Sequence, residues 1–150
     1  MLLFLNDARI PASQFIKTLP PETSLEHTFY PPAIPSGHFE REHNYPIFFS
    51  KTPGETAPTD KKFVYNAGEA GLDKRLTDYL VVDNFTVDRL NDPYICQSMP
   101  VECDFFKQLS TGHSEHYKLI REFSYSLPPY LPQLQISFVN PTIRIYQRTQ

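Results

Sequence analysis

Histidine and glutamate gather in one short stretch, HFEREH, at residues 38–43. Such side chains supply the nitrogen and oxygen ligands that zinc, iron and manganese accept in proteins. His38 and His43 are five residues apart, whereas two metal ligands on one helix face need a spacing of three or four. On a strand, His38 and Glu40 would share one face and His43 would lie on the other. The stretch makes His38, Glu40 and His43 candidate metal ligands, but a solvated polar loop is the interpretation that the spacing favours.

Two aspartates flank the apolar run YLVV, which lies between Asp78 and Asp83. The carboxyl ends of strands are where α/β sheets commonly bind ligands. Asp83 and Asn84 are therefore the pair of polar residues best placed to face a ligand. The structural alternative, which we favour, is that Asp83 caps the helical turn TVDRL that follows.

The chain has two cysteines, Cys96 and Cys103, seven residues apart. Their spacing is not CxxC, and no neighbouring histidine or cysteine completes a zinc site. They could form a disulfide in an oxidising compartment or be small core residues in the cytosol, and the spacing alone does not decide. The sequence contains no GxGxxG loop and no GxSxG elbow, so we predict no catalytic residue and no cofactor.

Composition narrows the class of protein. A length of 150 residues with 40% apolar residues fits one folded domain over 1–150. The net charge of −3, with mixed signs along the chain, gives no basic patch for nucleic acid or anionic lipid. The opening MLLFL is too short to span a bilayer, so the chain as given reads as soluble. The same residues, 1–5, could also be the end of a membrane helix whose upstream part is missing.

Hydrophobic periodicity predicts the elements that must position these residues. We expect a small α/β fold: a mixed sheet of about four to five strands, two main helices and a C-terminal strand hairpin with a wide connection. The 31–62 region reads as a long proline-rich loop, in which only YPIFF at 45–49 could be a strand. The helices are expected at 8–21 and 100–112, a helical turn at 86–90, and the strands at 24–32, 78–85, 116–127 and 142–148.

Three stretches together resemble a known family. LNDARIPASQFIKTLPPETSLEHTFYPP resembles the helix–strand pair that follows the last membrane helix in many lipid-carrier-dependent glycosyltransferases. DYLVVDNFTVDRL and CDFFKQLSTGHSEHYKLIREF resemble the middle of the soluble domain in those enzymes, and NPTIRIYQR resembles its last strand. The family is that of dolichyl-phosphate-mannose-protein mannosyltransferase-like (GT-C) membrane enzymes. The match covers most of the chain outside 31–62.

The resemblance implies a soluble C-terminal domain on the extracytoplasmic face of a membrane. Its partners would be the membrane-embedded part of the transferase and a lipid-linked sugar or acceptor, and an oxidising location would favour a Cys96–Cys103 disulfide. The family's catalytic residues lie in membrane-associated segments that this chain lacks, so none carries over. The expected role is a non-catalytic accessory domain, with a terminal strand whose edge Arg144, Arg148 and neighbouring loops shield. The alternative is a free-standing α/β binding module or a small metal-dependent hydrolase.

Overall fold

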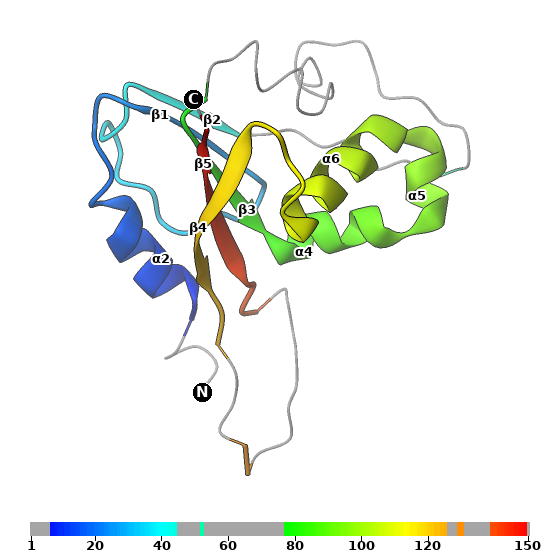
Figure 1. Ribbon diagram of the computed structural model, residues 1–150. Coiled ribbons are helices and arrows are strands. Elements are labelled where there is room, and N and C mark those ends of the chain that lie inside the picture. The colour runs from blue at the N-terminus through cyan, green and yellow to red at the C-terminus, as the bar shows by residue number, and fades with distance from the viewer. Residues whose placement is uncertain (1–6, 45–51, 53–76, 126–128, 131–138, 150) are drawn as a thin grey trace.

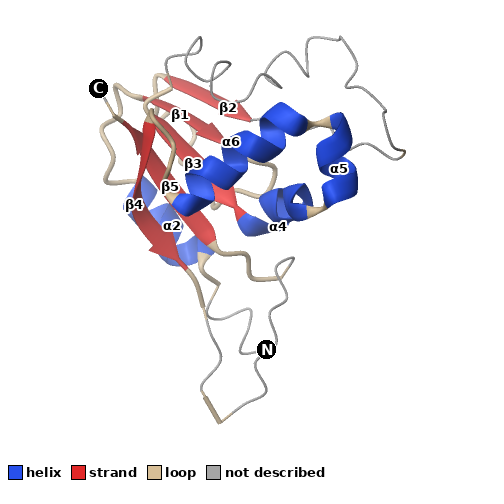
Figure 2. Cartoon of the chain, turned by 45° about the vertical axis from the view of Figure 1, so that its right-hand side comes forward, coloured by secondary structure: helices blue, strands red, loops and turns tan. Residues whose placement is uncertain are grey.

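A computed structural model gives the fold of residues 7–44, 52, 77–125, 129–130 and 139–149, and the description is confined to these. Their strands form one mixed five-stranded sheet in the order β2-β1-β3-β5-β4 (Figures 1 and 2). The strands are β1 (Ser24–His27), β2 (Arg41–Asn44), β3 (Tyr79–Asp83), β4 (Tyr117–Phe123) and β5 (Ile143–Arg148). β1 runs parallel to β2 and β3, whereas β5 runs antiparallel to β3 and β4. The predicted α/β class and mixed sheet are confirmed.

β3 is the middle strand, and all five of its residues are buried. Its run of apolar residues without alternation is typical of a strand covered on both faces. The register pairs Val81 with His27 on one side and with Ile145 on the other. The sequence expectation for this strand is therefore confirmed in position and in burial.

Helices cover both faces of the sheet. Figure 1 shows α2 (Arg9–Ile16) on one face and α4 (Asn84–Val87), α5 (Pro93–Ser98) and α6 (Pro100–Thr111) on the other. A short 3₁₀ helix, η2 (Asp88–Asn91), joins α4 to α5. The α2 side holds a core cluster of Ala12, Ile16, Leu19, Leu25, Phe39, Tyr79, Val81, Ile143 and Ile145. The α6 side holds Leu80, Val82, Leu90, Met99, Phe105, Phe106, Leu109, Tyr117 and Tyr146.

The two main helices begin and end for local reasons. Pro100 occupies the first turn of α6, where its missing N–H costs nothing. Gly112 ends α6 with φ of 73°, a left-handed conformation that a residue with a Cβ adopts only with strain. In α2, Ala12 and Ile16 are fully buried at a spacing of four residues. Both helices lie where the periodicity predicts them.

Three expectations need correction or fall outside the description. The 31–62 region contains β2 at Arg41–Asn44, which has no apolar alternation, so the prediction that only 45–49 could be a strand is wrong. Residues 45–49 themselves lie outside the described residues. The terminal strand β5 is not an edge, because β4 pairs with it and occupies the edge instead. Helix α5 was not predicted.

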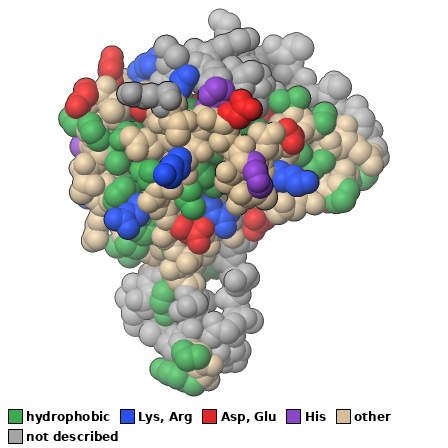
Figure 3. Space-filling view, in the orientation of Figure 1, with side chains coloured by type: hydrophobic (Ala, Val, Ile, Leu, Met, Phe, Trp, Pro, Cys, Tyr) green, Lys and Arg blue, Asp and Glu red, His purple; other side chains and the backbone are tan. Residues whose placement is uncertain are grey.

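No helix in the described part of the chain is both long enough and apolar enough to cross a bilayer. On the face shown in Figure 3, Lys and Arg side chains are interspersed with Asp and Glu. Charges of both signs are mixed on this face, as they are along the sequence.

Candidate functional site

Asp83, at the carboxyl end of β3, is fully buried and surrounded by hydrogen-bond donors. Its carboxylate accepts from the backbone N–H of Thr86 at 2.7 Å, which caps α4, and from the Thr86 hydroxyl at 2.7 Å. The Thr28 hydroxyl and the N–H of Tyr30 also donate to it. The predicted capping role is confirmed. A carboxylate with this many internal partners, and with no exposed surface, is not presented to a ligand.

Asn84 joins the end of β3 to the segment that leads into β5. Its side-chain oxygen accepts from the N–H of Thr142 at 2.8 Å, and its own N–H donates to the Thr142 carbonyl at 3.0 Å. Its side-chain N–H donates to Asp88 at 3.2 Å. The structure therefore places Asp83 and Asn84 side by side, but both hold neighbouring elements together.

The stretch at residues 38–43 is divided between a turn and a strand. The His38 ring is 3.0 Å from the Leu19 carbonyl oxygen and stacks edge-on against Phe39. Glu40 precedes β2, and its N–H donates to the carbonyls of Pro21 and Thr23. His43 belongs to β2, opposite Glu26 of β1. Within the described ranges, no three His, Cys, Asp or Glu side chains form a group that could hold a metal ion.

His27, on β1, approaches a glutamate of the edge strand. Its Nδ1 lies 2.8 Å from the Thr28 carbonyl oxygen, and its Nε2 lies 3.4 Å from a Glu42 carboxylate oxygen. The second contact is an ion pair only when the ring is protonated. The pair connects β1 to β2, which makes a structural role the simplest account of His27.

Cys96 of α5 and Cys103 of α6 are joined in a disulfide, with a Cα–Cα distance of 5.6 Å. The bond closes the corner between the two helices, where Ile95 and Cys103 pack against the α6-side core.

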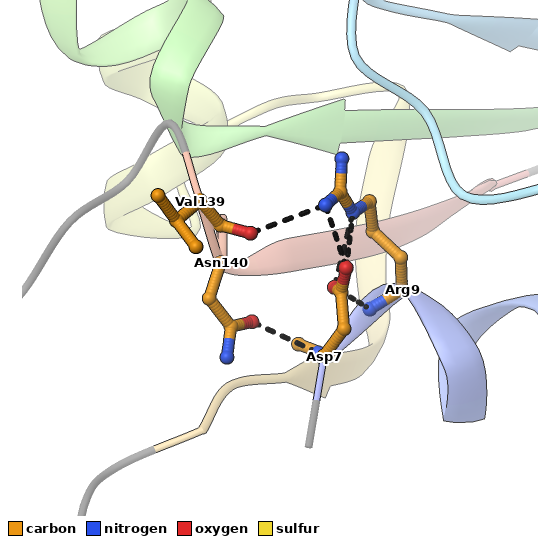
Figure 4. Close-up of polar contacts among 5 residues, drawn as sticks. Asp7, Arg9, Val139 and Asn140 are labelled. Carbon is orange, nitrogen blue, oxygen red and sulfur yellow. Dashed lines mark hydrogen bonds and ion pairs between the residues drawn. The ribbon is translucent and has the colours of Figure 1, made fainter. Parts of the chain in front are cut away.

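The beginning of α2 is tied to the residues before β5. Figure 4 shows the Arg9 guanidinium between the Asp7 carboxylate, at 2.6 Å, and the Val139 carbonyl, at 3.1 Å. The N–H of Ala8 donates to the side-chain oxygen of Asn140 at 2.9 Å. These contacts hold the beginning of α2 next to the residues that precede β5.

A surface depression of about 270 Å³ lies at the opposite end of the sheet. Its lining comes from the beginnings of β1 and β3 and from the end of β5: Thr23, Asp78, Tyr79, Gln147 and Arg148. Because side chains alternate along strands, Tyr79 and Gln147, which are directly paired, lie on the same face of the sheet. The depression is thus built by residues on adjacent strands that are far apart in the sequence.

The lining residues Tyr79 and Asp78 differ in the side-chain hydrogen bonds that they make with the described residues. The Tyr79 residue is 6% exposed, yet its hydroxyl makes no hydrogen bond with any residue in the described ranges. One carboxylate oxygen of Asp78 accepts from the N–H and the hydroxyl of Ser24, both at 2.7 Å. The other accepts nothing from the part of the chain that the structure describes.

Electrostatics at this depression favour a neutral phenol. Burial, and then the negative charges of Asp78 and Glu22, raise the pKa of the Tyr79 hydroxyl above its ordinary value. The hydroxyl therefore keeps its proton and can both donate and accept a hydrogen bond. Sequence reasoning identified Asp78 only as a strand flank and Arg148 only as a shield of the terminal strand, and it missed the other three residues because nothing local marks them.

Comparison with known proteins finds no family model that matches the chain, no similar curated protein and no similar solved structure. The likeness to GT-C enzymes therefore rests on the three sequence stretches alone.

Proposed function

We propose that this chain is a non-catalytic accessory domain of a lipid-carrier-dependent glycosyltransferase, which contacts the sugar acceptor outside the membrane. The single observation that carries the proposal is how the three stretches behind the resemblance are arranged. They supply β1, β3, β5 and β4, which are adjacent strands in that order in the sheet. The order and spacing of these stretches along the chain are those of the family's soluble domain, and they are harder to obtain by accident than any one motif.

The engagement of the acidic side chains supports a non-catalytic role. The Asp83 carboxylate holds the end of β1 and the start of α4, and one oxygen of Asp78 holds Ser24. A general acid or base must be within hydrogen-bond reach of its substrate, which the buried Asp83 is not.

The Arg9 contacts give the proposed domain a defined orientation. Residues 1–5 read as the end of a membrane helix under this proposal, and Asp7 and Ala8 follow at the start of α2. Arg9 and Ala8 bind Val139 and Asn140 next to the beginning of β5 (Figures 1 and 4). The proposal therefore puts the membrane side of the domain at that end.

Sequencing the transcript that encodes this chain tests the proposal. We expect segments of about 20 apolar residues to be encoded upstream of Met1, in the same frame or in an adjacent gene. Co-purification from detergent-solubilised membranes should then recover that polytopic product with this domain. A transcript without such segments, together with a domain recovered alone from the aqueous fraction, would contradict the proposal.

A further inference from the structure

We infer that one end of the domain docks on the headgroup region of a lipid bilayer, and that exposed aromatic and aliphatic side chains drive the contact. The surface consists of Ile10, Phe29, Tyr30 and Tyr130, and is called the docking end below. This lipid contact is separate from the proposed function, because it follows from where exposed apolar side chains lie on the chain.

Exposed apolar side chains are unevenly distributed over the described part of the chain. Seven large ones are exposed there, and three of them, Tyr94, Val101 and Leu119, are scattered over α5, α6 and β4. The other four gather at the end of the sheet where β5 begins: Ile10, Phe29, Tyr30 and Tyr130. Single exposed apolar residues are normal on a protein surface, whereas a group of them marks a surface for contact with a partner or a membrane.

Backbone contacts place these residues at the same end of the sheet. Tyr30, which follows Phe29, donates its N–H to the last residue of β3, and that residue pairs with the first residue of β5. The first turn of α2, which carries Ile10, lies at this end too, because the N-cap residue of α2 donates its N–H to Asn140 just before β5. Residues 129–130 belong to the connection from β4 to β5, and Figure 1 shows them beyond the same end.

The aromatic part of the docking end is held in a fixed arrangement. The Tyr30 ring packs edge-on against Phe85, with 4.8 Å between the ring centroids, and the Arg89 guanidinium lies 4.6 Å from the Phe85 centroid. Both contacts favour one arrangement of the rings. Tyr30 nevertheless remains 41% exposed, so the chain presents an ordered ring that has little conformational freedom left to lose on binding.

The residue types favour a bilayer interface as the occupant. Tyrosine combines an apolar ring with a polar hydroxyl, and such side chains collect at the level of lipid headgroups. Residues 1–5 are MLLFL, and at roughly 3.6 Å per residue they stay within about 20 Å of Asp7, which is at this end. Five apolar residues cannot span a bilayer, but they can add apolar surface to a contact that lies in its interface.

Two arginines at this end have their charges matched by neighbouring carboxylates. Arg9 pairs with Asp7 at 2.6 Å, and Arg144 of β5 pairs with Glu122 at 2.7 Å. Matched charges give little attraction to anionic lipid, so apolar contact must supply the affinity. We therefore expect reversible binding to zwitterionic phosphatidylcholine, with an association constant on the order of 10³–10⁴ M⁻¹ in accessible lipid.

Flotation of the intact chain with phosphatidylcholine vesicles tests this inference. At about 5 mM accessible lipid, we expect at least about four fifths of the protein to float with the vesicles. Including about 30% phosphatidylserine, or raising NaCl from about 50 to about 500 mM, should change the association constant by less than about threefold. Binding this weak is lost when membranes are washed, so co-purification with a polytopic product remains a separate test of the proposed function.

Matched variants connect the binding to the docking end. Tyr30→Ser should weaken binding about threefold to tenfold, because it removes a ring from the contact. Tyr94→Ser is the control, since Tyr94 on α5 is the same residue type with 39% exposure against 41% for Tyr30, and binding should stay within about 1.5-fold. Tyr130→Ser provides a second variant at an 83% exposed position, in case Tyr30→Ser perturbs the fold, and should weaken binding by a similar factor.

Nanodiscs that carry a spin-labelled lipid headgroup give the location, because the label broadens the amide signals of residues close to it. Broadening is expected at Ile10, Tyr30 and Tyr130 and not at Tyr94. Flotation of less than about a tenth of the protein at the same lipid concentration, or equal binding by all three serine variants, would overturn the inference. So would flotation with anionic vesicles alone, which would mark an electrostatic contact. Self-association that Tyr30→Ser abolishes, without vesicle binding, would instead make a second copy of the chain the occupant.

Discussion

Thr28 and Asp83 exchange hydrogen bonds across the carboxyl ends of β1 and β3: the Thr28 hydroxyl donates to the Asp83 carboxylate and accepts from the Asp83 N–H at 2.9 Å. Both residues are fully buried. This pair occupies the position at which α/β sheets commonly bind ligands. In this protein the hydrogen-bonded pair itself occupies that position, and the depression lined by Asp78 and Tyr79 lies at the other end of β3.

Asp83→Ala should lower the free energy of unfolding by about 3 kcal/mol or more. The substitution removes the cap of α4 and leaves several buried donors without an acceptor. Urea unfolding monitored by circular dichroism measures the change. Asp104→Ala is the control, since Asp104 is exposed and its side chain accepts from Gln108 one turn along α6, and the change in stability should stay within about 0.5 kcal/mol. Equal effects of the two substitutions would contradict the assigned role of Asp83.

Val81→Asp should prevent cooperative folding. Val81 is fully buried between α2 and the sheet, and a charge there would have no partner. Val101→Asp introduces the same side chain at a 56% exposed position in the first turn of α6, where a negative charge is favourable. Thermal melts of both variants test this prediction. Val101→Asp should unfold cooperatively, whereas a cooperative transition in Val81→Asp would show that β3 is misplaced.

Reducing the Cys96–Cys103 disulfide should cost about 2–3 kcal/mol of stability, because the bond closes a short loop and restricts the unfolded chain only modestly. Unfolding curves with and without reductant give the value, and the double substitution of both cysteines by serine should match the reduced protein. Protein purified from an oxidising compartment should show no thiol that reacts with an alkylating reagent. Alkylation of both cysteines under those conditions would contradict the disulfide.

Stability should fall at alkaline pH through Tyr146. Burial raises the pKa of its hydroxyl from the ordinary value of 10.0, with the Arg144 charge opposing the rise and Glu122 adding to it. The folded-state pKa is thus above the unfolded-state value, so the contribution is complete below about pH 10 and is lost as pH rises through the folded-state pKa. Tyr146→Phe should reduce the loss seen in urea unfolding between pH 8 and pH 11. The exposed Tyr130→Phe should leave the pH profile unchanged, and a Tyr146→Phe profile equal to the parent would contradict this account.

Protein purified without chelators should contain zinc, iron and manganese well below one equivalent by elemental analysis. The hydrolase alternative centres on His38, Glu40, His43 and Asp83. Two of these are engaged elsewhere, because the His38 ring contacts the Leu19 carbonyl and the Asp83 carboxylate is surrounded by internal donors. One equivalent of a bound metal that survives dialysis would favour the hydrolase.

Elements with strong local signals were predictable. β3 follows from an unbroken apolar run between two aspartates, and α6 from its apolar spacing and the stop at Gly112. Helix α5 was missed although Pro93 and the capping Asp92 mark its start, because six residues with no buried side chain give no periodic signal. β2 was missed for a related reason, since the polar sequence REHN becomes a strand only by pairing with β1.

The sequence by itself determined the α/β class, the buried middle strand, the main helices and the capping role of Asp83, because each leaves a local pattern of apolar spacing or of capping residues. Only the tertiary structure decided that β5 lies inside the sheet, and that Thr23, Tyr79 and Gln147 meet at one depression. These residues are brought together by strand order and register, which are set by burial over the whole sheet and leave no mark at any single position.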